Sequence, residues 1–299
     1  MEILTVRNLH KRFGDKEVLC GLDLSVPANS IFGFVGKNGA GKTTTMKAIL
    51  GLLRWDEGEI LVNGERVAFG QTATNRMIGY LPDVPEFYPF MTAKEYLRFC
   101  GESVGMTGRE LASRCDELLS LVGLSRENHR VKGFSRGMKQ RLGIAAALLG
   151  RPKLLICDEP TSALDPIGRR EVLDIVQSVR EQTTVLFSTH VLSDVERVCT
   201  DVALLDGGRI AMQGTVHDLK KQNRGEGFSV EVLDPAVADG LQEAFPMALR
   251  TAPTSLTLVG EERLLYELLS YLGEHEISVG RIERIEPSLE SLFVEVVSK

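Results

Sequence analysis

The chain has 299 residues, 43% hydrophobic and 25% charged, with a formal net charge of −6. This composition is ordinary for globular proteins and excludes a wholly disordered, collagen-like or disulfide-stapled chain. At roughly 150 residues per domain, the length predicts about two domains and a sizeable core.

Charge and targeting signals narrow the possible partners. Residues 1–225 carry 30 basic and 27 acidic side chains, whereas residues 226–299 carry 5 and 14, so the tail is a poor candidate for binding nucleic acid or anionic lipid. Five cysteines without C-x-x-C spacing fit a reducing cytoplasm better than secretion. The first residues lack the pattern of a signal peptide, and the longest uncharged apolar run, Leu142–Gly150, is too short to span a bilayer. Any membrane part must therefore come from another chain.

The periodicity of the first 220 residues predicts a parallel α/β core. Alternating residues and short apolar runs predict strands at 2–7, 22–26, 31–35, 154–157 and 184–188. Apolar residues at helical spacing predict helices at 43–50, 111–122 and 172–179. Strands that alternate with helices favour a parallel sheet. The segment 86–131 is expected to be wholly helical, as an inserted α subdomain.

A glycine-rich loop follows the third predicted strand and fits the pattern G-x-x-x-x-G-K-[ST]. Glycines let successive backbone N–H groups point into one concavity that holds phosphate oxygens, and the following helix adds its positive N-terminal end. Lys42 can reach the β- and γ-phosphates, and the Thr43 hydroxyl can bind Mg²⁺. The alternative is an ordinary strand–helix turn. The predicted nucleotide-binding residues are Gly36, Lys37, Asn38, Gly39, Ala40, Gly41, Lys42, Thr43 and Thr44.

Two adjacent carboxylates end the strand predicted at 154–157. In a parallel sheet the strand ends carry the site. Asp158 is expected to hold Mg²⁺, and Glu159 is expected to polarise the attacking water as the catalytic base. The alternative is a helix cap or a surface loop.

The segment Gly133–Arg141 resembles the signature motif of ATP-binding-cassette (ABC) ATPases, with Ser135 and Gly137 at its centre. Three further features match that family in its order: Phe13 as the aromatic residue for adenine, Asp165 in the D-loop, and His190 as the switch histidine that contacts the γ-phosphate. Phe13 and His190 could instead be core residues, and Ser135 a helix cap.

The resemblance implies a P-loop NTPase fold with an ABC-type helical subdomain at about 86–150, and ATP and Mg²⁺ as cofactors. It also implies an ATP-sandwich dimer, in which Ser135 and Gly137 of one copy act on the ATP of the other. Lys42, Glu159 and His190 are the expected catalytic residues.

The chain departs from the family pattern at Asp83, where the family usually has a glutamine that binds Mg²⁺. It also departs at Arg136, where the family usually has glycine, and at Met138, where it usually has glutamine. Asp83 can still offer an oxygen to the metal, or it can be a loop residue. The apolar stretch 84–91 that follows lies near the groove where transporters receive a helix of the membrane subunit. Local core packing is the alternative for this stretch.

The tail after a polar linker at 220–227 is predicted to be a small α+β domain. Strands are expected at 228–232, 256–258 and 277–285, and helices at 265–272 and 289–297. The domains are therefore an ABC ATP-binding domain at 1–222 and an accessory domain at 226–299, a tail that resembles those of type-2 ABC exporter subunits. Its role could be regulation, dimer contact or mere packing.

These features favour a cytoplasmic ATPase subunit of an ABC transporter of the exporter type. It is expected to lie on the inner face of the membrane through a separate permease and not to bind nucleic acid. The alternatives are a soluble ABC ATPase acting on ribosomes or nucleic acid, and a P-loop kinase or GTPase. Against the last, the chain has no N-K-x-D guanine-reading motif.

Overall fold

The structure is a computed structural model that describes residues 1–70, 73–222, 227–260, 262–284 and 288–297. Its contacts divide the chain into two units, Met1–Val216 and His217–Lys299. The linker predicted at 220–227 lies partly outside the described residues. Each unit has its own hydrophobic core.

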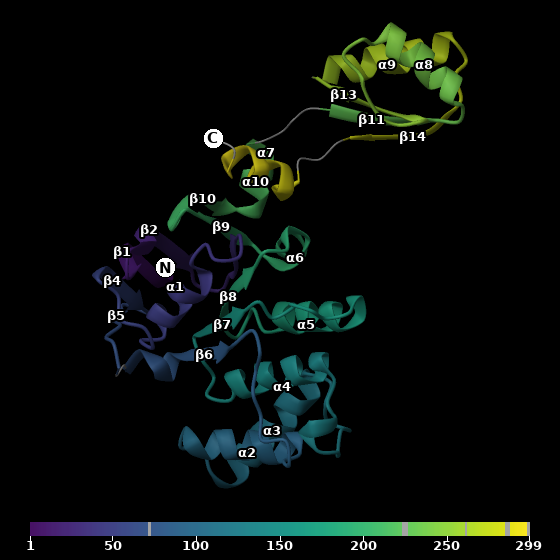
Figure 1. The fold of residues 1–299 in the computed structure, drawn as a ribbon. Coiled ribbons are helices and arrows are strands. Elements are labelled where there is room, and N and C mark those ends of the chain that lie inside the picture. The colour runs from purple at the N-terminus through teal and green to yellow at the C-terminus, as the bar shows by residue number, and fades with distance from the viewer. Residues whose placement is uncertain (71–72, 223–226, 261, 285–287, 298–299) are drawn as a thin grey trace. The chain divides into compact units, whose positions relative to one another are not determined.

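A six-stranded sheet forms the centre of the first unit (Figure 1), in the order β10-β9-β3-β8-β7-β6. All neighbours are parallel except β9 and β10, which are antiparallel. Every residue of β3, β7 and β8 is buried, as expected for parallel strands covered on both faces. The strands are β3 (Ile31–Gly36), β6 (Ile78–Leu81), β7 (Leu154–Asp158), β8 (Thr184–Thr189), β9 (Asp201–Asp206) and β10 (Arg209–Thr215).

One face of this sheet packs with helix α1 (Lys42–Ile49) and with a second, antiparallel sheet. Phe32 and Phe34 of β3 share a core with Met46 and Ile49 of α1 and with residues of the second sheet. The order of the second sheet is β2-β1-β4-β5. Its strands are β1 (Glu2–Phe13), β2 (Lys16–Pro27), β4 (Glu57–Val62) and β5 (Glu65–Arg66).

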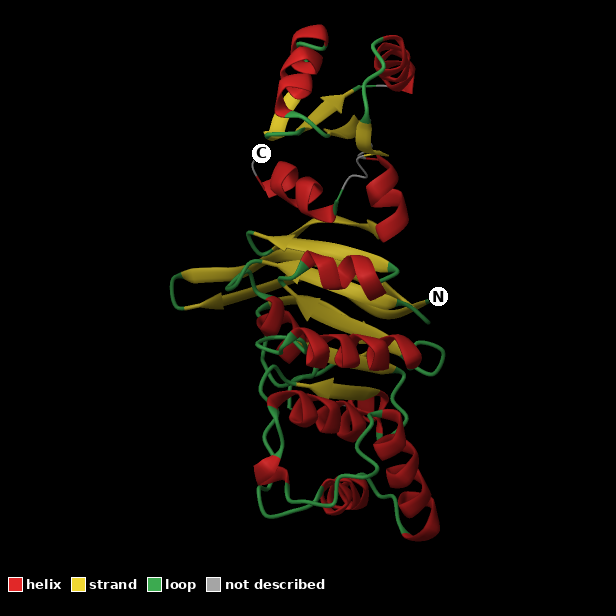
Figure 2. Cartoon of the chain, turned by 90° about the vertical axis from the view of Figure 1, so that its right-hand side faces the viewer, coloured by secondary structure: helices red, strands yellow, loops and turns green. Residues whose placement is uncertain are grey.

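The other face packs with helices, which Figure 2 shows in red against the yellow sheet. Their buried residues share one core with Ile31, Leu155 and Phe187 of the sheet. The helices of this part are α2 (Ala93–Ser103), α3 (Gly108–Leu121), α4 (Arg136–Leu148), α5 (Pro166–Ser178) and α6 (Leu192–Val198), with short 3₁₀ turns at Ala73–Met77 and Val131–Gly133.

The prediction of a wholly helical segment at 86–131 is wrong at its start, at residues 104–107 between α2 and α3, and at residues 122–130 after α3. Helix begins only at Ala93, and residues 82–92 are an irregular loop. Prolines at 82, 85 and 89 explain the late start, because proline has no N–H to donate and disfavours helix at the residue before it. Thr92 then starts α2 with a capping box, in which its side chain accepts from the Glu95 N–H.

The second unit contains a four-stranded antiparallel sheet in the order β12-β13-β11-β14. With α8 and α9 the chain order is β-α-β-β-α-β, the split βαβ arrangement, and both helices cover the same face of the sheet (Figure 1). Its elements are β11 (Gly227–Val232), α8 (Pro235–Ala244), β12 (Leu249–Ala252), β13 (Ser255–Val259), α9 (Glu262–Glu274) and β14 (Val279–Arg284); α7 (Val216–Gln222) and α10 (Leu289–Val297) complete the chain.

The sequence patterns identified only part of this unit. Helix α8 and strand β12 were not predicted. Helix α8 buries only Ala238 and Leu241, and no residue of β12 is buried. In α9 the expected core residue Leu269 is 44% exposed, while Leu268 and Leu272 are buried. The strand predicted to reach Ile285 is described as far as Arg284, and Ile285 lies outside the described residues.

The close approach of β6 to α4 yields a stability prediction. A Cβ at Gly79 would overlap the carbonyl oxygen of Ala147 and lie 3.0 Å from Pro152 Cγ. We expect Gly79→Ala to destabilise the protein by about 1–3 kcal/mol and to lower its Tm by several degrees. Gly150→Ala is the control, because a Cβ there meets nothing within 4 Å. Equal Tm values for the two variants would contradict this packing.

Candidate active site

The candidate site is a cavity of about 380 Å³ at the carboxyl ends of β3, β7 and β8. These strands are direct neighbours, so the loops that follow them meet at one edge of the sheet. The cavity is lined by Asn38, Gly39, Gly41, Lys42, Thr43, Thr44, Asp83, Asp158, Glu159, Ser162 and His190.

The glycine-rich loop connects β3 to α1 and forms one wall of the cavity. Gly41, the residue before the helix, has φ 113°, a left-handed conformation that side chains strain to adopt. The Lys42 side chain folds back over the loop, and its Nζ donates to the Gly36 carbonyl at 2.7 Å. This arrangement fixes a buried ammonium group beside the N-terminus of α1, where anions are favoured.

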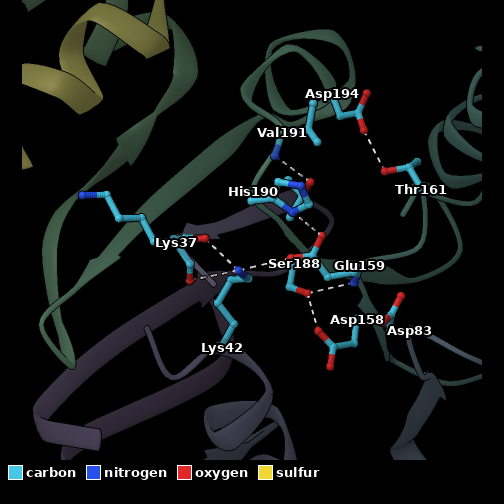
Figure 3. Close-up of polar contacts among 12 residues, drawn as sticks. Lys37, Lys42, Asp83, Asp158, Glu159, Thr161, Ser188, His190, Val191 and Asp194 are labelled. Carbon is cyan, nitrogen blue, oxygen red and sulfur yellow. Dashed lines mark hydrogen bonds and ion pairs between the residues drawn. The ribbon is translucent and has the colours of Figure 1, made fainter. Parts of the chain in front are cut away.

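Glu159 follows β7, and its carboxylate contacts the side chains of Lys42 and His190 (Figure 3). Its Oε1 lies 3.1 Å from Lys42 Nζ, and its Oε2 lies 2.9 Å from His190 Nδ1. The Glu159 side chain is 14% exposed, whereas that of His190 is 48% exposed. His190 is therefore not a core residue, and the structure rules out that alternative.

Asp158 lies beside Glu159 and is held by two hydroxyl groups. Ser188 Oγ donates to Asp158 Oδ1 at 2.6 Å, and Thr43 Oγ1 donates to Asp158 Oδ2 at 2.8 Å. Asp83, from the loop after β6, lines the same cavity. Hydroxyl and carboxylate oxygens are the ligands that Mg²⁺ takes, usually one or two carboxylates together with substrate phosphates. The residues therefore fit Mg²⁺, although no cluster of three acidic, His or Cys side chains suited to a metal is found in the described ranges.

Cys157, next to Asp158 in β7, is not a candidate nucleophile. Burial, together with the neighbouring Asp158 charge, raises the pKa of its thiol to about 12. The reactive thiolate is therefore scarce at neutral pH.

Known proteins share this sequence and this fold. Residues 19–162 match the family described as ABC transporter. The chain is 37% identical to an uncharacterized ABC transporter ATP-binding protein of Bacillus subtilis (strain 168), over 99% of both chains. It is 32% identical to a linearmycin resistance ATP-binding protein of the same strain, again over 99% of both. The chain belongs to the ABC transporter ATP-binding proteins.

A solved structure of an ATP-binding subunit of an ABC transporter confirms the predicted fold class. The two chains are 34% identical, and their structures match with a TM-score of 0.65. The match covers 74% of this chain and 92% of the chain in the solved structure. ABC cassettes hydrolyse ATP, so this chain is an ATP-binding subunit with ATPase activity. One relative is named for an ABC transporter and the other for antibiotic resistance, and neither name supports a soluble ATPase acting on ribosomes or nucleic acid. No helix in the described residues has the length and hydropathy needed to cross a bilayer.

Four predicted binding residues of this ABC ATPase lie outside the cavity lining. Phe13 is 48% exposed at the end of β1, with Lys11 Nζ over its ring, so it is not a core residue. Ser135 caps α4 by accepting from the Met138 N–H at 3.2 Å. Gly137 follows it in α4, and Asp165 caps α5 by accepting from the Gly168 N–H. Three positions of the glycine-rich loop, Gly36, Lys37 and Ala40, are also absent from the lining.

Two of the departures from the family pattern, Asp83 and Arg136, meet in the structure. Arg136 Nη2 lies 3.7 Å from Asp83 Oδ1, an oxygen shielded from solvent that has no hydrogen-bond partner in the described part of the chain. Burial raises the pKa of Asp83 and Arg136 lowers it. The buried Gln140 also donates from Nε2 to the Asp83 carbonyl at 2.7 Å. The loop after β6 is thus joined to the signature helix through both backbone and side chain.

Sequence reasoning missed the two serines that complete the site, Ser162 and Ser188. Ser188 both donates to Asp158 and accepts from the Glu159 N–H at 3.0 Å. Its position at the end of a buried strand, just before the expected switch histidine, is the one signal that could have identified it.

The double role of Ser188 predicts a combined effect on stability and activity. Ser188→Ala leaves a buried carboxylate oxygen without its donor, so we expect a loss of about 1–3 kcal/mol in stability together with reduced ATPase activity. Ser178→Ala is the control, because the Ser178 hydroxyl only bonds the Ile175 carbonyl within α5. Thermal unfolding and phosphate release measure the two effects. A Ser188→Ala protein that matches the control in both would overturn the assignment.

Proposed function

We propose that this ABC ATPase powers an exporter: it drives a separate membrane permease and works as an ATP-sandwich dimer. The observation that carries the proposal is the convergence of Lys42, Glu159 and His190 on one cavity at the strand ends. The resistance named for the linearmycin relative, which aligns over the whole chain, supports export.

In this proposal the glycine-rich loop binds the phosphates of ATP. Residues 36–44 offer backbone N–H groups and the N-terminus of α1, and Lys42 contributes the positive charge. Phe13 stacks on the adenine, a role that its exposed ring leaves available. Thr43 and Asp158 would hold Mg²⁺, with Asp83 as a third oxygen donor. The ion supplies positive charge against the phosphate oxygens when it is bound.

Glu159 acts as the general base. Its carboxylate accepts a proton from the attacking water, whose oxygen bonds to the γ-phosphorus of ATP. The bond from that phosphorus to the bridging oxygen of the β-phosphate breaks, which leaves ADP and inorganic phosphate. The contact between Glu159 Oε2 and His190 Nδ1 holds the carboxylate in place, and the exposed His190 ring is free to reach the γ-phosphate.

The signature residues support a dimer. Ser135, Gly137 and Asp165 are presented at the N-termini of α4 and α5, yet they do not line the cavity of their own chain. In a head-to-tail, two-fold dimer they face the ATP of the other copy, so that each site is completed by both chains.

An exposed aromatic patch is the proposed contact with the permease. Val84, Tyr88 and Phe90 of the loop after β6 and Phe99 of α2 are 46–62% exposed, and the Tyr88 ring packs edge-on against Phe99. Exposed apolar patches of this kind mark protein–protein contacts. Phe87 instead packs on the helical core with Tyr96, so core packing accounts for only part of the stretch 84–91.

The proposed domains are an ATP-binding domain at 1–222, with its helical subdomain at about 86–150, and an accessory domain at 226–299 with a regulatory or dimer-contact role. The relatives that align over the whole chain retain both parts. The protein is proposed to lie in the cytoplasm against the inner face of the membrane, bound through the permease.

The general-base role predicts the effect of removing the charge of Glu159. Glu159→Gln should lower turnover by about 10²–10⁴-fold while ATP binding is retained, because the amide keeps the shape but cannot accept the proton. Phosphate release and binding of a fluorescent ATP analogue measure the two quantities. Glu181→Gln, an exposed substitution after α5, is the control. Turnover within a few fold of the unmodified protein would refute the role.

The proposed role of the aromatic patch predicts which substitutions abolish binding of the permease. Tagged Glu159→Gln protein, incubated with Mg²⁺ and ATP, should recover a multi-span protein from detergent-solubilised membranes. Adding Phe90→Ser should abolish this recovery, because it removes the centre of the patch. Phe69→Ser, at a similarly exposed phenylalanine outside the patch, should not. Equal recovery with both variants would remove the patch from the interface.

A further inference from the structure

The loop that carries Glu159 contains backbone strain. Glu159 has φ 48° and Ala163 has φ 50°, and neither is glycine. Such left-handed conformations are unfavourable for residues with a Cβ and persist only where surrounding contacts hold them. The contacts that hold residues 159–163 therefore decide where the Glu159 carboxylate points.

A buried carboxylate on α6 provides one such contact. Asp194 is 3% exposed, and its Oδ2 accepts from Thr161 Oγ1 at 2.8 Å. Its Oδ1 accepts from Arg169 Nε of α5 at 2.7 Å. Both oxygens are thus used, and the Arg169 charge compensates the buried anion, so the arrangement is geometrically specific.

The loop after β8 and helix α6 each hold this turn once, as Figure 3 shows. His190 contacts the Glu159 side chain directly, and Asp194, four residues later, holds Thr161 at the middle of the strained turn. The turn is anchored at its beginning as well, since the Glu159 N–H donates to Ser188 Oγ at 3.0 Å. The hydrogen bond from Thr161 to Asp194 therefore joins this turn to α6.

We propose that Thr161 and Asp194 are positioning residues for hydrolysis. Their hydrogen bond keeps Glu159 in its left-handed conformation, with the carboxylate aimed into the nucleotide cavity next to His190. The inference rests on the proposed role of Glu159 as general base. It predicts that loss of the bond lowers turnover without weakening ATP binding, because neither residue lines the cavity.

Two nearly isosteric substitutions separate the hydrogen bond from the packing. Thr161→Val removes the donor and keeps the shape, and should lower kcat at least tenfold while KM and ATP affinity stay within twofold. Thr161→Ser restores the hydroxyl and should keep kcat within about threefold. Asp194→Asn is a second variant, because it removes the charge that pairs with Arg169, and we expect the same split between kcat and KM. All assays run well below the Tm of each variant.

The decisive measurement repeats Thr161→Val in the Glu159→Gln protein. A residue that acts through Glu159 has no further effect once that carboxylate is gone, whereas a general structural role lowers the residual turnover again. The proposal is supported if Thr161→Val lowers kcat tenfold in the protein that retains Glu159 and does not lower the residual kcat of the Glu159→Gln protein. Equal losses in both backgrounds, or full kcat in Thr161→Val, would overturn it. If Glu159→Gln alone retains turnover, the general-base role of Glu159 is wrong. This result is distinct from a failure of the positioning role of Thr161 and Asp194.

Discussion

The parallel pairing of β8 with β3 on one side and β7 on the other is the constraint on which the site depends. The register sets Val35 opposite Thr189 and Asp158 opposite Ser188, so three strands end at the same level. Residues far apart in the chain then meet at one edge of the sheet. A shift of register by one residue would turn every side chain of a strand to the other face.

Compensation of buried charge is the second requirement. Lys42 and Glu159 are both largely shielded from water and lie 3.1 Å apart, while Asp158 is satisfied by Thr43 and Ser188. Because an unpaired buried charge is costly, each of these groups restricts the position of the others. The arrangement is rigid where chemistry is proposed, and the His190 ring at its edge is exposed.

Local motifs could be predicted because each depends on neighbouring residues. The glycine-rich loop, the carboxylates after β7 and the strands and helices around them were found from spacing and period alone. Predictions failed where contacts with distant parts of the chain decide which residues are buried or where a helix begins. Leu269 follows the helical period of α9 yet is exposed, because the sheet covers only part of that helix. The helix expected from residue 86 starts at Ala93, where Thr92 caps it after the last proline.

The sequence by itself determined the fold class and the pattern of the phosphate loop, because backbone conformation and apolar period are local properties. The choice of His190 came from the resemblance to ABC ATPases. Only the tertiary structure decided that Asp83 meets Arg136, that Ser188 bridges Asp158 and Glu159, and that Asp194 reaches Thr161. These contacts join residues between 29 and 53 positions apart, and each exists because the packing of sheet and helices sets the distance between elements that no local pattern relates.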